Sequence, residues 1–86
     1  MSTYIGRMID ILAEELERLE NELKSVVHTT SIVSLQQRQY DRIEAKATMI
    51  SILALAFPSD RGFKFVAEDA NKLALEAEGL RENRVA

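Results

Sequence analysis

The chain has 86 residues, of which 47% are hydrophobic and 29% are charged, and these values are typical of one globular domain. It contains no cysteine, which excludes disulfides, zinc fingers, iron–sulfur clusters and a thiol nucleophile. Its 11 basic and 14 acidic side chains give a net charge of −3, so there is no basic excess to follow a phosphate backbone. We therefore expect a single domain over residues 1–86, held together by packing, and nucleic acid is not the first expected partner.

The expected fold class is all-α, because one proline and three glycines are too few turn-formers for many short strands. The first helix is predicted over about residues 4–28, where apolar side chains alternate at intervals of four and three. This is the spacing of an a/d seam, the stripe by which helices pair in coiled coils. The seam consists of Ile5, Ile9, Leu12, Leu16, Leu19, Leu23 and Val26.

A second helix is predicted over about residues 32–57, after a short turn, and Ser34 with Gln37 is a candidate capping box at its start. Its flank is basic, whereas the flank of the first helix is acidic. Two helices joined by a short turn form an antiparallel hairpin most simply, with these flanks facing each other. The stripe of the second helix consists of Gln36, Tyr40, Ile43, Ala47, Ile50, Ala54 and Phe57.

The end of this second helix is apolar on nearly every face. A helix of this kind must be buried on more than one side, by a further helix or by another subunit. We therefore expect a homodimer, in which this segment meets its copy across a two-fold axis. The expected dimer interface consists of Met49, Ile50, Ile52, Leu53, Leu55 and Phe57.

A third helix is predicted over about residues 63–80. Pro58 ends the second helix, and residues 58–62 have the composition of a tight connection. The third stripe runs from Phe63 to Leu80 with several alanines, which permit close approach of a neighbour. Residues 81–86 are expected to fray. The expected architecture is a helical hairpin with a third, C-terminal helix, completed as a bundle by dimerisation.

Few residues of the sequence are candidates for catalysis or for binding a metal or a phosphate. His28 is the only histidine, and no acidic residue stands at a metal-binding spacing from it, so a favourable place at the end of the first helix explains it best. No glycine-rich phosphate loop is present, and the hydroxyl side chains lack an identifiable base. We expect neither an enzyme nor a cofactor or metal site.

The expected function is that of a small regulator or adaptor that binds itself and another protein. The candidate partner contacts are Glu15, Glu20, Glu22, Arg61, Phe63 and Phe65. A structural subunit of a larger helical assembly is the alternative. Nucleic-acid binding through Arg61, Lys64, Arg81 and Arg84 is a third and weaker reading, because acidic residues are interleaved with these cations.

The segment Ala47-Thr48-Met49-Ile50-Ser51-Ile52-Leu53, placed near the end of a long helix after a helical hairpin, resembles the TraM family of quorum-sensing antiactivators. Members of that family are small, cytoplasmic, helical dimers that sequester a LuxR-type transcription factor, and the resemblance implies the same activity here. The third helix departs from that pattern, since it extends beyond the point where the family pattern stops.

The expected location is the cytoplasm. No apolar run near the N-terminus is long enough for the core of a signal peptide. The most apolar stretch, residues 47–57, has eleven residues and is too short to span a bilayer.

Overall fold

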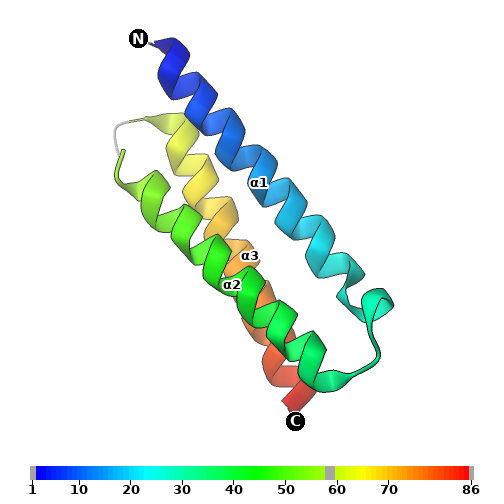
Figure 1. Ribbon diagram of the computed structural model, residues 1–86. Coiled ribbons are helices and arrows are strands. Elements are labelled where there is room, and N and C mark those ends of the chain that lie inside the picture. Colours follow the sequence, from blue (N-terminus) through cyan, green and yellow to red (C-terminus); the bar gives the residue numbers. More distant parts are fainter. Residues whose placement is uncertain (1, 58–59, 86) are drawn as a thin grey trace.

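The computed structural model describes residues 2–57 and 60–85. Helix α1 spans Ser2–Thr29, α2 spans Val33–Leu55 and α3 spans Arg61–Val85, and the described residues contain no strand. The three helices run antiparallel in sequence order (Figure 1), in an elongated shape of 47 × 20 × 13 Å. The all-α prediction of a hairpin followed by a third helix is confirmed.

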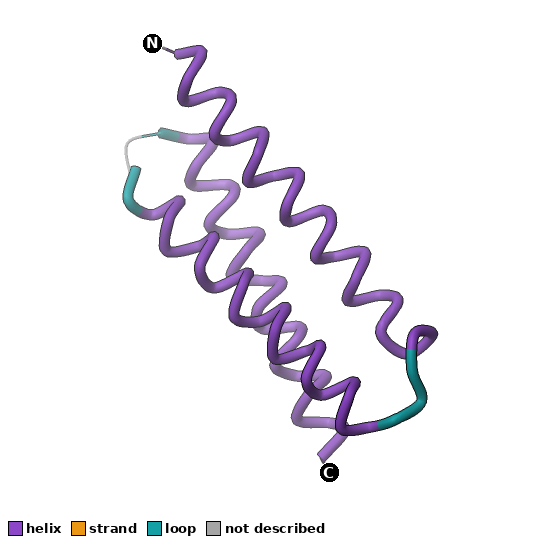
Figure 2. The backbone as a smooth tube through the Cα atoms, viewed as in Figure 1, coloured by secondary structure: helices purple, strands orange, loops and turns teal. Residues whose placement is uncertain are grey.

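Helices α2 and α3 form the most closely packed pair, and α1 lies against both of them with fewer contacts. In Figures 1 and 2, α3 runs behind α1 and α2. Small side chains explain the close approach of α2 and α3, because Ala47 and Ala54 of α2 and Ala70 and Ala77 of α3 are almost completely buried. Where the facing side chains are alanines, two helix backbones can come nearer to each other than where they are leucines.

The predicted seams supply the core. The buried residues of α2 are the predicted stripe with one exception, since Phe57 lies beyond the end of the helix. Along α1 burial increases toward the C-terminus: Ile5 is exposed, Ile9 and Leu12 are partly buried, and the four following seam residues are buried. The buried hydrophobic residues are Leu16, Leu19, Leu23, Val26, Tyr40, Ile43, Ala47, Ile50, Ala54, Phe63, Val66, Ala67, Ala70, Leu73, Ala74 and Ala77.

The turn between α1 and α2 is held by Thr30. Its hydroxyl oxygen accepts a hydrogen bond from the backbone N–H of Ile32 at 3.1 Å, and its carbonyl accepts one from Nε2 of Gln36 at 2.7 Å. The N-cap of α2 is Ile32, whose side chain makes no capping hydrogen bond, so the capping box predicted at Ser34 and Gln37 is not formed. Gln36 instead faces inward, where it is 3% exposed and anchors the turn.

Helix α3 begins at an aspartate cap. Oδ1 of Asp60 accepts hydrogen bonds from the N–H groups of Gly62 at 2.8 Å and Phe63 at 3.4 Å, which satisfies two donors that a helix start leaves free. The ring of Phe63 stacks on that of Phe57, with centroids 4.6 Å apart. The predicted stop at Pro58 falls just outside the described residues.

Two predicted helix ends differ from the structure. Helix α2 ends at Leu55 and not at residue 57, and α3 continues to Val85 where fraying was predicted from residue 81. The extension of α3 has a tertiary cause. The guanidinium of Arg81 donates hydrogen bonds to the carboxylates of Asp41 and Glu44 on α2, so the end of α3 is tied to the middle of α2.

Candidate functional site

Exposed apolar side chains gather at the end of α2. Met49 and Ile52 are 62% and 64% exposed, and Leu53 and Leu55 are exposed to a similar extent. Their positions on the helix explain this, because the stripe through Ala47, Ile50 and Ala54 occupies the inward side and the intervening residues must point elsewhere. Monomeric proteins seldom expose a contiguous apolar patch of this kind unless it binds something.

Two residues of the predicted dimer interface are placed differently from the rest. The side chain of Ile50 is buried in the chain's own core, and that of Phe57 is partly covered by its stacking on Phe63. Met49, Ile52, Leu53 and Leu55 remain free to meet a partner. The sequence pattern placed Ile50 in the same interface as its exposed neighbours. In the structure Ile50 belongs to the core, and only the neighbours are accessible to a partner.

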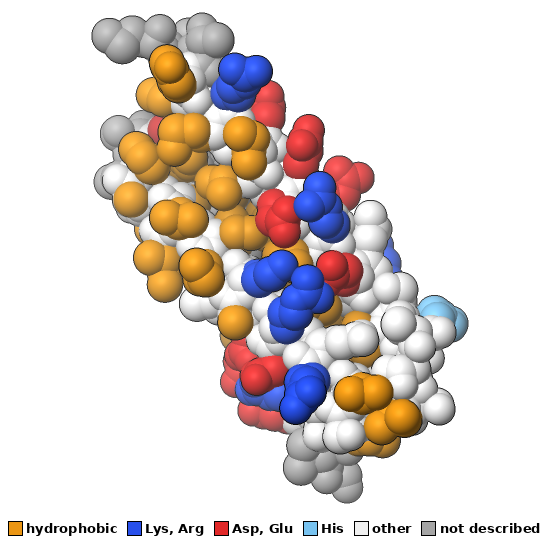
Figure 3. Space-filling model, viewed as in Figure 1, with side chains coloured by type: hydrophobic (Ala, Val, Ile, Leu, Met, Phe, Trp, Pro, Cys, Tyr) orange, Lys and Arg blue, Asp and Glu red, His pale blue; other side chains and the backbone are white. Residues whose placement is uncertain are grey.

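Helix α1 also has three exposed apolar residues near the end of α2, and none of them belongs to the dimer interface predicted from the sequence. Tyr4 and Ile11 are 79% and 58% exposed, and Met8 is also exposed. Figure 3 shows hydrophobic side chains gathered where α1 begins and α2 ends. We call the set from both helices the apolar face. It consists of Tyr4, Met8, Ile11, Met49, Ile52 and Leu53.

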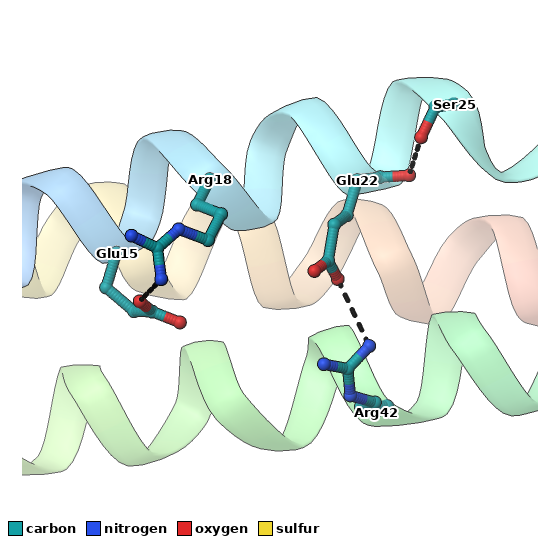
Figure 4. A network of polar contacts seen from close by, with 5 residues as sticks. All are labelled: Glu15, Arg18, Glu22, Ser25 and Arg42. Atoms are coloured by element: carbon teal, nitrogen blue, oxygen red, sulfur yellow. Dashed lines mark hydrogen bonds and ion pairs between the residues drawn. The ribbon is translucent and has the colours of Figure 1, made fainter.

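A band of charged side chains follows the apolar face along the same two helices (Figure 3). Glu22 points from α1 toward α2, where Nη1 of Arg42 lies 3.4 Å from its carboxylate. Arg18 reaches back along α1 to Glu15 at 3.2 Å (Figure 4). All four side chains are substantially solvent-accessible, and such pairs contribute only about 0.2–1 kcal/mol each. The Glu22–Arg42 pair joins two helices, so it contributes more to the alignment of α1 with α2 than to stability.

The six predicted partner contacts lie in three different places. Glu15 and Glu22 belong to the charged band. Glu20 lines a depression of about 340 Å³ between α1 and α3, whose rim also carries further acidic side chains. Arg61 and Phe65 line a shallow hollow on α3, but Phe63 is fully buried and unavailable to a partner.

The groups that could carry chemistry are dispersed. Within residues 2–57 and 60–85, no three His, Cys, Asp or Glu side chains come together in a way that could hold a metal ion. His28 lies exposed in the last turn of α1, as its sequence position led us to expect. The cations named for nucleic-acid binding are not brought together, because Arg61 and Lys64 lie at the start of α3 and Arg81 lies near its end, where two carboxylates engage it. The hydrogen bond that the guanidinium donates to the carboxylate of Asp41, with the nearby charge of Glu44, raises the pKa of Arg81 above its ordinary value.

These features define a class of protein: a three-helix, all-α chain that presents an apolar face built from two helices. Comparison with known protein families, with curated proteins and with solved structures finds no match to this chain. Among the described residues, no helix has the length and apolar character needed to cross a membrane.

Proposed function

We propose that this protein is a non-enzymatic, cytoplasmic regulator or adaptor that acts by protein–protein interaction and self-associates as a homodimer. The observation that carries the proposal is the apolar face. Six large side chains from two helices are exposed to solvent, in the region where hydrophobic side chains gather (Figure 3), although the core of the same chain is well supplied with aliphatic and aromatic residues. Exposed apolar side chains grouped in this way favour association with a second protein surface.

The charged band supports the same proposal. An apolar centre bordered by charged and polar side chains is the usual composition of a protein interface. The border on α1 carries Glu15 and Glu22, and the border on α2 carries Arg42 and Lys46. Charges of both signs at the border select among partners and set the orientation of binding more than they add affinity.

Light scattering behind size exclusion, over a concentration series, tests the self-association. We expect the wild type to have about twice the mass of the 9.7 kDa chain, and the Ile52→Asp variant to be a folded monomer, because a buried carboxylate at an interface is strongly unfavourable. Ile52 is exposed in the single chain, so this substitution leaves the helical core intact. Circular dichroism of the variant verifies that its helices remain.

The matched control is Leu75→Asp. Leu75 is 60% exposed on α3, outside the apolar face, and its substitution should leave the mass unchanged. A wild type that stays monomeric at every concentration would remove self-association from the proposed function. A mass that keeps rising with concentration would favour the alternative, a structural subunit of a larger assembly.

Binding to another protein is tested with the wild-type chain as bait. Reversal of Glu15, Glu20 and Glu22 together with Phe65→Ala should release the bound partner, because the three glutamates are half of the six acidic side chains of α1 and Phe65 is exposed on α3. If all partners remain bound, the placement of this contact is wrong. The sequestration of a transcription factor, which the resemblance of residues 47–53 implies, is one specific form of the proposed function, and three residues of the apolar face lie within that segment.

A further inference from the structure

The apolar face has an internal pattern on α1. Residues Tyr4, Met8, Ile11, Glu15, Arg18 and Glu22 succeed one another at intervals of four and three, which is a second a/d-type seam beside the buried one. Its first three members are apolar and exposed, and its last three are charged. A seam with this spacing has the geometry for packing against another helix. No other helix of the described chain covers it.

Helix α2 carries a seam of the same kind in the opposite order. It consists of Leu35, Gln39, Arg42, Lys46, Met49, Leu53 and, at the C-cap, Ala56. The first member is apolar, the middle members are polar or basic, and the last three are apolar. The change from basic to apolar at the end of α2 runs opposite to the change from apolar to charged along α1, which suits two antiparallel helices.

The Glu22–Arg42 pair sets the register of the two seams. Ile11 precedes Glu22 by 11 residues, and Leu53 follows Arg42 by 11 residues. Because an α-helix rises about 1.5 Å per residue, Ile11 and Leu53 lie at the same level of the bundle, as do Met8 and Ala56. The apolar halves of both seams consequently coincide at one end, and the charged halves coincide in the middle (Figures 3 and 4).

We propose that this double seam seats a second copy of the chain, with a two-fold axis parallel to the helices, so that α1 of each copy lies across α2 of the other. This inference rests on the self-association in the proposed function, and it specifies which helices of the two copies meet. A rotation about such an axis keeps every residue at its level. The apolar half then meets the apolar half, and Glu22 of α1 lies level with Arg42 of the other copy. Glu15 lies within one turn of the level of Lys46, and Arg18, which is level with Lys46, is held by its pair with Glu15.

Charge complementarity distinguishes this arrangement from its alternative. A two-fold axis perpendicular to the helices would place α1 on α1 of the other copy. Glu15 and Glu22 would then lie either near the same glutamates of the other copy or outside the interface. The axis parallel to the helices instead places them near Arg42 and Lys46 of the other copy. Like charges brought together across an interface are unfavourable, and opposite charges set the pairing.

The face is smaller in outline than a standard interface. From Tyr4 to Glu22 the seam is about 27 Å long, and two adjacent helices are about 20 Å wide, which gives an outline of about 540 Å². A standard interface buries about 800 Å² on each partner, so the double seam has the size of a weaker, concentration-dependent contact. Its exposed members are large side chains, which supply most of the binding energy when they are buried.

Disulfide trapping tests the geometry, and the absence of native cysteine makes each introduced thiol unique. Two single variants, Ile11→Cys and Leu53→Cys, are prepared with tags of different mass, mixed, and oxidised mildly. We expect the mixed pair to yield a covalent product containing one chain of each kind, several-fold faster than either variant yields its own homodimer. Leu75→Cys, exposed on α3, is the control for random collision.

Each other outcome overturns the inference in a distinct way. If Ile11→Cys alone forms the dominant product, α1 lies on α1, and the proposed geometry is wrong although the proposed self-association stands. If no product exceeds the Leu75→Cys control and light scattering gives the mass of one chain, the second copy is not the occupant. The binding of another protein would then still be tested separately by the bait experiment.

Discussion

At the scale of single residues, Gly62 marks a close approach between α1 and α3. A Cβ at this position would lie 2.5 Å from Cδ1 of Ile9, which is closer than side chains tolerate. The backbone of α3 thus approaches α1 at its first turn because residue 62 has no side chain. The same residue donates its N–H to the cap formed by Asp60, so the cap and the close approach depend on the same turn.

We expect Gly62→Ala to gain less stability than alanine at the other two glycines, because the end of the Ile9 side chain must move to admit the new Cβ, and this offsets the gain in helix propensity. Urea denaturation measures it. In the Ile9→Val background, where Cδ1 is absent, the same Gly62→Ala substitution should gain more stability than it does in the wild type.

The matched controls are the other two glycines. A Cβ on Gly6 or Gly79 would meet no atom within 4 Å, so alanine at either position should stabilise the protein by about 0.5–1 kcal/mol. Equal stabilisation by alanine at all three glycines would contradict the close contact of Gly62 with Ile9.

At the scale of secondary-structure elements, alanines decide which pair of helices packs closely. Ala70 and Ala77 of α3 and Ala47 of α2 are completely buried, and α2 with α3 is the closest pair. The seam of α1 has leucines and isoleucines at the corresponding positions, and these hold a neighbour at a greater distance.

We therefore expect Ala70→Leu to destabilise the protein by about 1–3 kcal/mol, because the added atoms force α2 and α3 apart. Thermal denaturation followed by circular dichroism measures the change. Ala45→Leu is the control, since Ala45 is exposed on α2 and substitution there should change stability by less than about 0.5 kcal/mol. A small effect of Ala70→Leu would mean that the two helices separate easily.

At the scale of the whole molecule, burial is unequal along the bundle. The first half of α1 is held by the partly buried Ile9 and Leu12, whereas its second half contributes four buried residues. At the opposite end Arg81 joins α3 to α2 through two carboxylates. The end that carries the apolar face is thus the end at which α1 is least covered.

Hydrogen exchange should reflect this gradient. In dilute solution the amides of residues 8–13 are expected to exchange about tenfold or more faster than those of α2 near Ile43, because few buried contacts oppose local opening there. Protection of residues 8–13 should rise with concentration if a second copy covers the face. Equal protection of both regions in dilute solution would contradict the gradient.

Much of the fold was predictable from the sequence. The spacing of four and three locates the three helices and identifies nearly the entire inward stripe of α2. Such a pattern fixes the angle of each side chain around its own helix axis, because every L-residue in an α-helix turns by the same amount. The helix ends were less accurate, since the continuation of α3 depends on contacts of Arg81 with residues about forty positions earlier.

The candidate site required the tertiary structure. The sequence alone determined that the end of α2 is apolar on all sides and that α1 is acidic where α2 is basic. Only the fold decided that Ile50 points into the core, that Phe63 is buried, and that exposed apolar side chains from the start of α1 and the end of α2 gather on one face. The physical reason is that helical periodicity states in which direction a side chain points, whereas its exposure depends on whether a neighbouring helix occupies that direction.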